Sequence, residues 1–190
     1  MTKKILIFES SPRKQGNTAV LARQASEALI SAGVEVETLH LHGMKIAPCN
    51  HCDGCLRKKQ YCVIEDDMQA IYPKLAAADG VILASPIYWF TFNAQLKTCI
   101  DRWYGLWQND HAFFKGRPAG AIMVYGDADL YISGGINAIS TFETMFRFMG
   151  AEPAGFVYGT ANDVGDAEKD EALMESARQL GVRMAERVSV

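Results

Sequence analysis

The predicted fold is organised around the stretch Phe8-Glu9-Ser10-Ser11-Pro12-Arg13-Lys14-Gln15-Gly16-Asn17-Thr18. It follows the apolar run at residues 5–8, which predicts a buried strand, and it precedes apolar residues at helical spacing. A strand, a polar turn and a helix start form an anion site, because the first N–H groups of a helix are unpaired and its dipole attracts negative charge. The turn also carries side-chain donors and a cationic fork suited to phosphate: Ser10, Ser11, Arg13, Asn17 and Thr18.

Two familiar phosphate motifs are excluded by this turn. No Gly-Lys-Ser/Thr closes it, as a Walker A loop requires, and it is not Gly-x-Gly-x-x-Gly. Its donors come from side chains more than from glycine backbone, which suits one terminal phosphate better than a pyrophosphate. The alternative is an ordinary capped turn, with Asn17 or Thr18 as the N-cap.

Composition places the chain among globular proteins. Its 190 residues suit one domain, residues 1–190, and 49% hydrophobic content is enough for a sizeable core. A net charge of -3 gives no reason to expect nucleic acid or an anionic membrane as a partner. No apolar run is long enough to span a bilayer, and residues 1–8 lack the features of a signal peptide, so we expect a cytoplasmic location.

Strand-like runs alternate with helical patterns along the chain. Strands are predicted at 4–8, 34–39, 80–84, 119–125 and 154–158, and helices at 18–32, 66–78, 93–107, 135–149 and 166–188. This alternation predicts a parallel sheet with helices on both faces, with strand 34–39 at an edge. Ligands of such sheets bind at the carboxyl ends of the strands. Residues 44–66 are predicted to form a cysteine-rich insertion loop.

Two further loops leave the carboxyl ends of predicted strands. Residues 85–93 place four aromatic side chains just beyond a buried strand, which Pro86 is expected to end. Such a loop either holds a flat ring or covers the core or a subunit interface. The glycine-rich loop at residues 126–135 is a second candidate wall of the same pocket.

The three loops together resemble the flavodoxin-like, NAD(P)H-dependent FMN reductase superfamily. The first loop carries the resemblance, reinforced by Ala84-Ser85-Pro86-Ile87-Tyr88-Trp89, Ala94-Gln95-Leu96-Lys97 and Ile100-Asp101-Arg102. It implies a flavodoxin-like three-layer sandwich with a five-stranded parallel sheet in the order 2-1-3-4-5, binding FMN and using NAD(P)H. It also implies a homodimer or homotetramer, with Gln95, Lys97 and Arg102 either at its interface or on a solvated helix face.

The resemblance assigns the cofactor residues by position. The residues implied to hold the ribityl phosphate are Ser10, Arg13, Gly16, Asn17 and Thr18. Those implied to line the isoalloxazine are Pro86, Ile87, Tyr88, Trp89 and Phe90, with Gly126 and Asp127 nearby. No catalytic residue is assigned, because the flavin itself carries the electron chemistry.

Four of the five cysteines lie within fourteen positions, in a pattern that resembles the iron–sulfur flavoprotein branch of that superfamily. Cys49, Cys52, Cys55 and Cys62 give a Cys₄ set suited to a [4Fe–4S] cluster. Two alternatives remain open: zinc, with His51 as a further ligand, and free thiols acting as a redox pair. Cys99 lies on the apolar face of a predicted helix and is expected in the core, whereas His40, His42 and His111 have no evident partner.

Two functions follow as expectations. In the first, NAD(P)H reduces bound FMN, which then reduces a small-molecule acceptor such as a quinone, a metal ion or free flavin. In the second, the protein is an iron–sulfur flavoprotein that carries electrons to or from a ferredoxin-like partner. A third possibility is a binder of another phosphate ligand on the same fold, because a fold does not fix a function.

Overall fold

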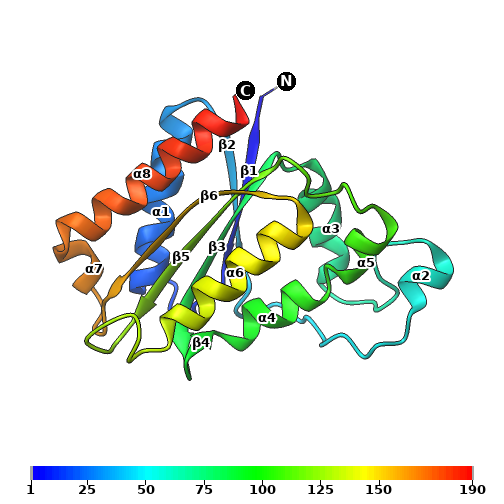
Figure 1. Ribbon diagram of the computed structural model, residues 1–190, viewed down its shortest axis with the longest axis horizontal. Coiled ribbons are helices and arrows are strands. Elements are labelled where there is room, and N and C mark those ends of the chain that lie inside the picture. Colours follow the sequence, from blue (N-terminus) through cyan, green and yellow to red (C-terminus); the bar gives the residue numbers. More distant parts are fainter. Residues whose placement is uncertain (1, 190) are drawn as a thin grey trace.

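A computed structural model describes residues 2–189 and contains the predicted sheet. The five parallel strands are β1 (Lys4–Glu9), β2 (Glu35–His40), β3 (Gly80–Tyr88), β5 (Pro118–Tyr125) and β6 (Glu152–Thr160). Their order, β2-β1-β3-β5-β6, is the predicted order, and β2 lies at an edge as expected (Figure 1). A two-residue strand that the sequence did not predict, β4 (Thr91–Phe92), pairs antiparallel with the end of β3.

Helices cover both faces of this sheet (Figure 1). One face carries α1 (Asn17–Ser31), α7 (Asp166–Lys169) and α8 (Glu171–Val188), and the other carries α3 (Met68–Ala77), α4 (Ala94–Asp101), α5 (Tyr104–Asn109) and α6 (Gly135–Met149). Alternation along β1 supplies both cores, since Ile5 and Ile7 face α1 and α8 whereas Leu6 and Phe8 face the other layer. A short helix, α2 (Gly54–Lys58), interrupts the cysteine region, which the sequence predicted as a loop.

Two predicted helices are broken in the structure. The helix expected at 93–107 is divided into α4 and α5 at Arg102 and Trp103, which are both buried. The helix expected at 166–188 is divided at Asp170, whose carboxylate accepts the Leu173 N–H (2.9 Å) and caps α8. Among residues 2–189, no helix has both the length and the apolar character needed to cross a bilayer.

The expectation that Pro86 ends the third strand is wrong. β3 runs on to Tyr88, and Pro86 lies opposite Val124 of β5. Ala84 C=O accepts the Ser10 N–H (3.0 Å), so by the alternation of a strand the Pro86 nitrogen also faces β1, at the level where β1 has already ended. The Ser10 carbonyl instead accepts a hydrogen bond from the Asn93 side chain (2.7 Å), which replaces the N–H that proline lacks.

Candidate functional site

The turn between β1 and α1 closes tightly on itself. The Gly16 N–H donates to Arg13 C=O (2.9 Å), and the Arg13 N–H donates to the Ser11 hydroxyl (3.1 Å). Gly16 is the N-cap, and a Cβ there would lie 2.9 Å from the Cβ of Arg13, so a larger residue would open the turn. The first N–H groups of α1 therefore end beside a compact ring of polar atoms, as an anion site requires.

A cavity of about 180 Å³ lies in front of this turn, at the carboxyl ends of β3, β5 and β6. It brings together residues from all three predicted loops. The predicted residues that line it are Arg13, Gly16, Asn17, Thr18, Pro86, Ile87, Tyr88 and Gly126. The predicted residues outside this lining are Ser10, Trp89, Phe90 and Asp127.

Two of the predicted phosphate residues are held by other parts of the protein. Ser10 is fully buried, and its hydroxyl donates to Ala84 C=O (3.0 Å). The Asn17 amide donates to Asp163 C=O (2.8 Å) and accepts the Ala167 N–H (3.2 Å), which ties α1 to the segment after β6. We therefore expect Asn17 to offer a ligand its main-chain N–H at the helix start.

The sequence analysis missed four lining residues as candidates: Val124, Tyr125, Ala161 and Asn162. Ser11, which the sequence analysis named as a donor of the turn, also lines the cavity, although the resemblance did not assign it to the phosphate. Ala161 and Asn162 directly follow β6, so they occupy the carboxyl end of a strand. The sequence prediction ended that strand at residue 158, so residues 160–162 were not recognised as lying at its carboxyl end.

The wall formed by the end of β3 is fixed by Ser85 and Asn93. The Ser85 hydroxyl donates to Pro86 C=O (2.8 Å) and accepts the Asn93 N–H (3.0 Å). The Asn93 side chain caps α4 by accepting the Leu96 N–H (3.2 Å). These bonds set the direction in which Pro86, Ile87 and Tyr88 meet the cavity.

A buried carboxylate lies beneath the turn. Glu9 is 1% exposed, and its carboxylate accepts the Ser11 N–H (2.8 Å) and lies 3.1 Å from His40 Nδ1. His40 therefore has a partner that the sequence did not reveal. Burial raises the pKa of the Glu9 carboxyl above its ordinary value, although His40 and the Ser11 N–H act in the opposite direction.

The cysteine region is fastened at both ends by Arg102. Its guanidinium donates to Ala47 C=O (2.7 Å) before the cysteines and to Asp66 Oδ2 (2.6 Å) after them. Arg102 is 2% exposed, so the expectation that it lies on a solvated helix face or at a subunit interface is wrong for this residue. Cys99 lies in the core as predicted, where burial raises the pKa of its thiol to about 12.

The predicted metal ligands do not converge in this structure. Cys49 and Cys52 are exposed, and Cys55 and Cys62 are half-buried. Between residues 2 and 189, no three Cys, His, Asp or Glu side chains gather in a group able to hold a metal ion. The residues as arranged here therefore do not form a ligand set for a [4Fe–4S] cluster or for zinc.

Comparison with known proteins places the chain in a family. A family model described as NADPH-dependent FMN reductase matches residues 3–163. The chain belongs to this family. It is 33% identical over 191 residues to an iron-sulfur flavoprotein from Archaeoglobus fulgidus, covering 96% of this chain and 95% of that protein.

A second relative and a solved structure support membership of this family. The FMN reductase chain is 32% identical over 186 residues to YwqN of Bacillus subtilis, named as an NAD(P)H-dependent FMN-containing oxidoreductase, covering 93% of this chain and 96% of YwqN. The solved structure of Trp repressor binding protein from Bacillus subtilis matches with a TM-score of 0.71 and 28% identity, covering 94% and 99% of the two chains. The predicted flavodoxin-like fold and FMN reductase resemblance are thus confirmed.

Proposed function

We propose that this protein binds FMN in the cavity at the carboxyl ends of β3, β5 and β6 and transfers electrons from NAD(P)H to a small acceptor. The observation that carries the proposal is the meeting, in one cavity, of the α1 N-terminus, the exposed Arg13 and the end of β3. The helix start and the guanidinium suit a phosphate, and Pro86, Ile87 and Tyr88 offer an apolar edge to a ring.

The cavity is large enough to enclose only part of FMN. A volume of about 180 Å³ is below the 300–1,000 Å³ typical of sites that enclose a whole ligand. The cavity therefore suits the phosphate and ribityl chain, with the isoalloxazine lying outward along Tyr88, which is 47% exposed. A ring held in this way keeps one face open to NAD(P)H and to an acceptor.

The chemistry supplied by FMN is the acceptance of a hydride from NAD(P)H and the release of two electrons to the acceptor. With a quinone as the acceptor, the net reaction would consume NAD(P)H, one proton and the quinone and yield NAD(P)⁺ and the hydroquinone. The protein's own residues bind and orient: the α1 N–H groups, Ser11, Thr18 and Arg13 receive the phosphate. Ser85 and Asn93 hold in place the end of β3, which would meet the edge of the ring.

The second candidate function is electron transfer by an iron–sulfur flavoprotein with a ferredoxin-like partner. It is favoured by the name of the Archaeoglobus fulgidus relative and by the Arg102 bonds that fasten the cysteine region. In that case Cys49, Cys52, Cys55 and Cys62 would have to rearrange to bind a cluster. We further propose a homodimer or homotetramer and a cytoplasmic location, where free thiols and NAD(P)H are both maintained.

The test is FMN binding by the Arg13→Ala variant, measured by quenching of flavin fluorescence. Loss of a charged hydrogen bond costs about 1.5–3 kcal/mol, so we expect Kd to rise about 10- to 150-fold. Arg187→Ala is the matched control, because Arg187 is exposed in the last turn of α8, away from the cavity. An unchanged Kd for Arg13→Ala would show that the phosphate lies elsewhere.

A further inference from the structure

The proposed binding of FMN leaves one buried carboxylate, that of Glu9, without a function. Glu9 is the last residue of β1, and its side chain is buried beneath the turn that leads into α1. A carboxylate is rarely buried unless it has a partner, because removing its charge from water is costly. Its position beside a proposed phosphate site makes its charge important, since two negative groups repel each other most strongly where water does not screen them.

A chain of hydrogen bonds joins Glu9 to the surface on one side and to the turn on the other. His40 Nδ1 lies 3.1 Å from Glu9 Oε2, and the His40 side chain is 52% exposed, so it can exchange protons with solvent. Glu9 Oε1 accepts the Ser11 N–H (2.8 Å), and the Ser11 hydroxyl accepts the Arg13 N–H (3.1 Å). The chain therefore links an exposed histidine to the residue proposed to bind the phosphate.

The two neighbouring strands hold this pair in place. Glu9 lies opposite His40 in the parallel register of β1 and β2, and the Leu41 N–H donates to Glu9 C=O (2.8 Å). The charged groups that act on the Glu9 carboxylate are His40 and His42, at the end of β2 and just beyond it, whereas its neighbour on β3 is the uncharged Ala84. Because histidine changes its charge between about pH 5 and 8, the charge of this group of residues depends on pH in that range.

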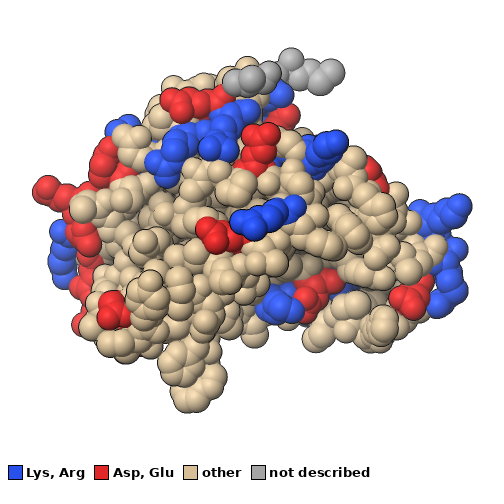
Figure 2. All heavy atoms as spheres, in the orientation of Figure 1, with Lys and Arg blue, Asp and Glu red and all other residues tan. Residues whose placement is uncertain are grey.

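Exposed charges have a weaker effect on the turn than Glu9. Acidic and basic side chains lie interspersed on the face shown in Figure 2, and the net charge of the chain is -3. Exposed charges of both signs partly cancel, and salt screens them over about 10 Å. A buried carboxylate is screened much less, so its protonation state has a large effect on the potential at the turn.

We propose that Glu9 and His40 form a proton-dependent positioning pair that controls the affinity of the turn for the phosphate of FMN. With one proton shared between the carboxyl group and the imidazole, the pair is neutral and the turn receives the phosphate. Without that proton, the pair carries one buried negative charge, which repels the phosphate. By linkage, bound phosphate favours the uptake of a proton by the pair. This inference rests on the proposed FMN site and adds a group that makes binding depend on pH.

The test compares FMN with riboflavin, which lacks the phosphate, by measuring the Kd of each from flavin fluorescence. At about pH 8, where the pair has lost its proton, we expect Glu9→Gln to bind FMN at least about 5-fold more tightly than the wild type. At about pH 5.5 the two proteins should bind FMN equally. Riboflavin should show no such difference at either pH. The ratio of the two Kd values at each pH removes the titration of the phosphate itself, whose second pKa is about 6.

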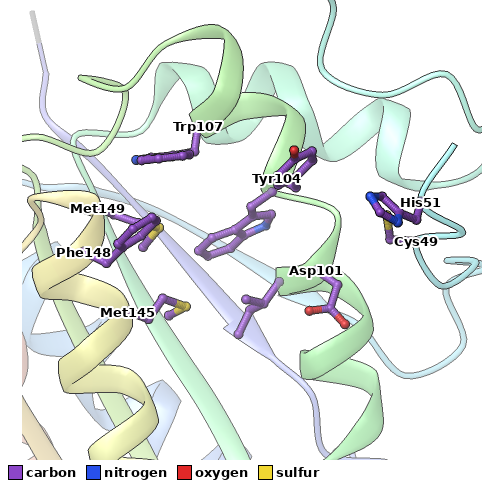
Figure 3. A pocket seen from close by; sticks show the side chains of 10 residues that line it. Cys49, His51, Asp101, Tyr104, Trp107, Met145, Phe148 and Met149 are labelled. Carbon is purple, nitrogen blue, oxygen red and sulfur yellow. The ribbon is translucent and has the colours of Figure 1, made fainter. Parts of the chain in front are cut away.

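A second variant, His40→Gln, removes the exposed member of the pair. Glu9 then has to hold the proton without the histidine, so the fall in FMN affinity with rising pH should move to lower pH. Asp101→Asn is the matched control, because Asp101 lies at the rim of a separate pocket between α4, α5 and α6, where Lys97 binds its carboxylate (2.6 Å; Figure 3). Removal of this carboxylate should leave the Kd for FMN unchanged relative to the wild type at both pH values.

Three results would overturn the role given to Glu9 and His40. The first is a Kd ratio between Glu9→Gln and wild type that is the same at both pH values, and the second is an equal change for riboflavin, which would show a purely structural role. The third is an unshifted pH profile for His40→Gln, which decides the question alone if Glu9→Gln does not fold. Wild-type protein that binds no FMN would overturn the proposed function itself, whereas FMN binding with a constant ratio overturns only the role of the pair.

Discussion

Replacing Arg102 with methionine should destabilise the protein by about 3 kcal/mol. Breaking a buried ion pair by removing one partner costs about 3–5 kcal/mol, because the remaining charge stays buried without compensation. Arg102 Nη1 lies 2.6 Å from Asp66 Oδ2, and Nη2 lies 3.1 Å from Asp66 Oδ1. Asp66 still accepts the Ala47 and Met68 N–H groups (2.9 and 3.0 Å) in the variant, so the lower end of the range applies.

Urea denaturation measures this loss. With an m-value of roughly 1–3 kcal/mol/M, the midpoint should fall by about 1–3 M. Lys97→Met is the matched control, since the Lys97–Asp101 pair is exposed and is worth about 0.3–0.5 kcal/mol. Thiol labelling should also accelerate at Cys55 and Cys62, which the fastened segment keeps half-buried. If Arg102→Met lowers the free energy of unfolding by less than about 1 kcal/mol, no more than an exposed ion pair is worth, the role given to Arg102 is refuted.

The same ion pair makes a prediction about acid. Burial alone would raise the pKa of the Asp66 carboxyl, but Arg102 and the Ala47 and Met68 N–H groups lower it below its ordinary value. A lowered folded-state pKa gives stability that is present above the unfolded pKa, near 3.8, and is lost as pH falls toward the folded value. The stability difference between wild type and Arg102→Met should therefore shrink in acid below about pH 4.

Two further variants test the packing around both sites. A Cβ at Gly105 would overlap the carbonyl of Tyr61, so Gly105→Ala should displace the cysteine region. We expect the free energy of unfolding, measured in urea, to fall by about 1–3 kcal/mol and thiol labelling of Cys55 to become faster. Unchanged labelling would contradict this prediction. Glu9→Gln keeps an acceptor for the Ser11 N–H and removes the Glu9 carboxyl group. Because the folded-state pKa of Glu9 is raised, its protonated form contributes to stability, and this contribution is lost as pH rises. The unfolding free energy of the variant, relative to that of the wild type, should therefore be higher at pH 7 than at pH 4. An equal difference at both pH values would contradict a raised pKa of Glu9 in the folded state.

Local sequence patterns predicted most of the fold because they match the periods of strands and helices. The apolar runs at residues 5–8 and 80–84 define the central strands, and the polar turn between strand and helix marks the end of the cavity where we propose that the phosphate binds. These features depend on neighbours within a few positions, which a sequence displays directly.

Long-range contacts decided the features that the sequence did not predict. Pro86 remains in β3 because Asn93 supplies the missing donor to Ser10. The helix breaks at Arg102, whose guanidinium is buried. This guanidinium binds Ala47 and Asp66, which lie 55 and 36 positions earlier in the chain. The turn at Trp89 and Phe90 is bound by the Asn137 side chain, 47 positions away, and both residues lie outside the lining of the cavity. None of these contacts has a local pattern, so none could be predicted from one sequence.

The most direct test of the account is the flavin content and reducibility of the purified protein. Protein prepared without oxygen should contain or take up about one FMN per chain, and NAD(P)H should bleach the bound flavin. Counting iron, sulfide and zinc in the same sample decides whether the cysteines hold a metal. Colourless protein that takes up no added FMN, or bound FMN that NAD(P)H leaves oxidised, would contradict the proposed reductase.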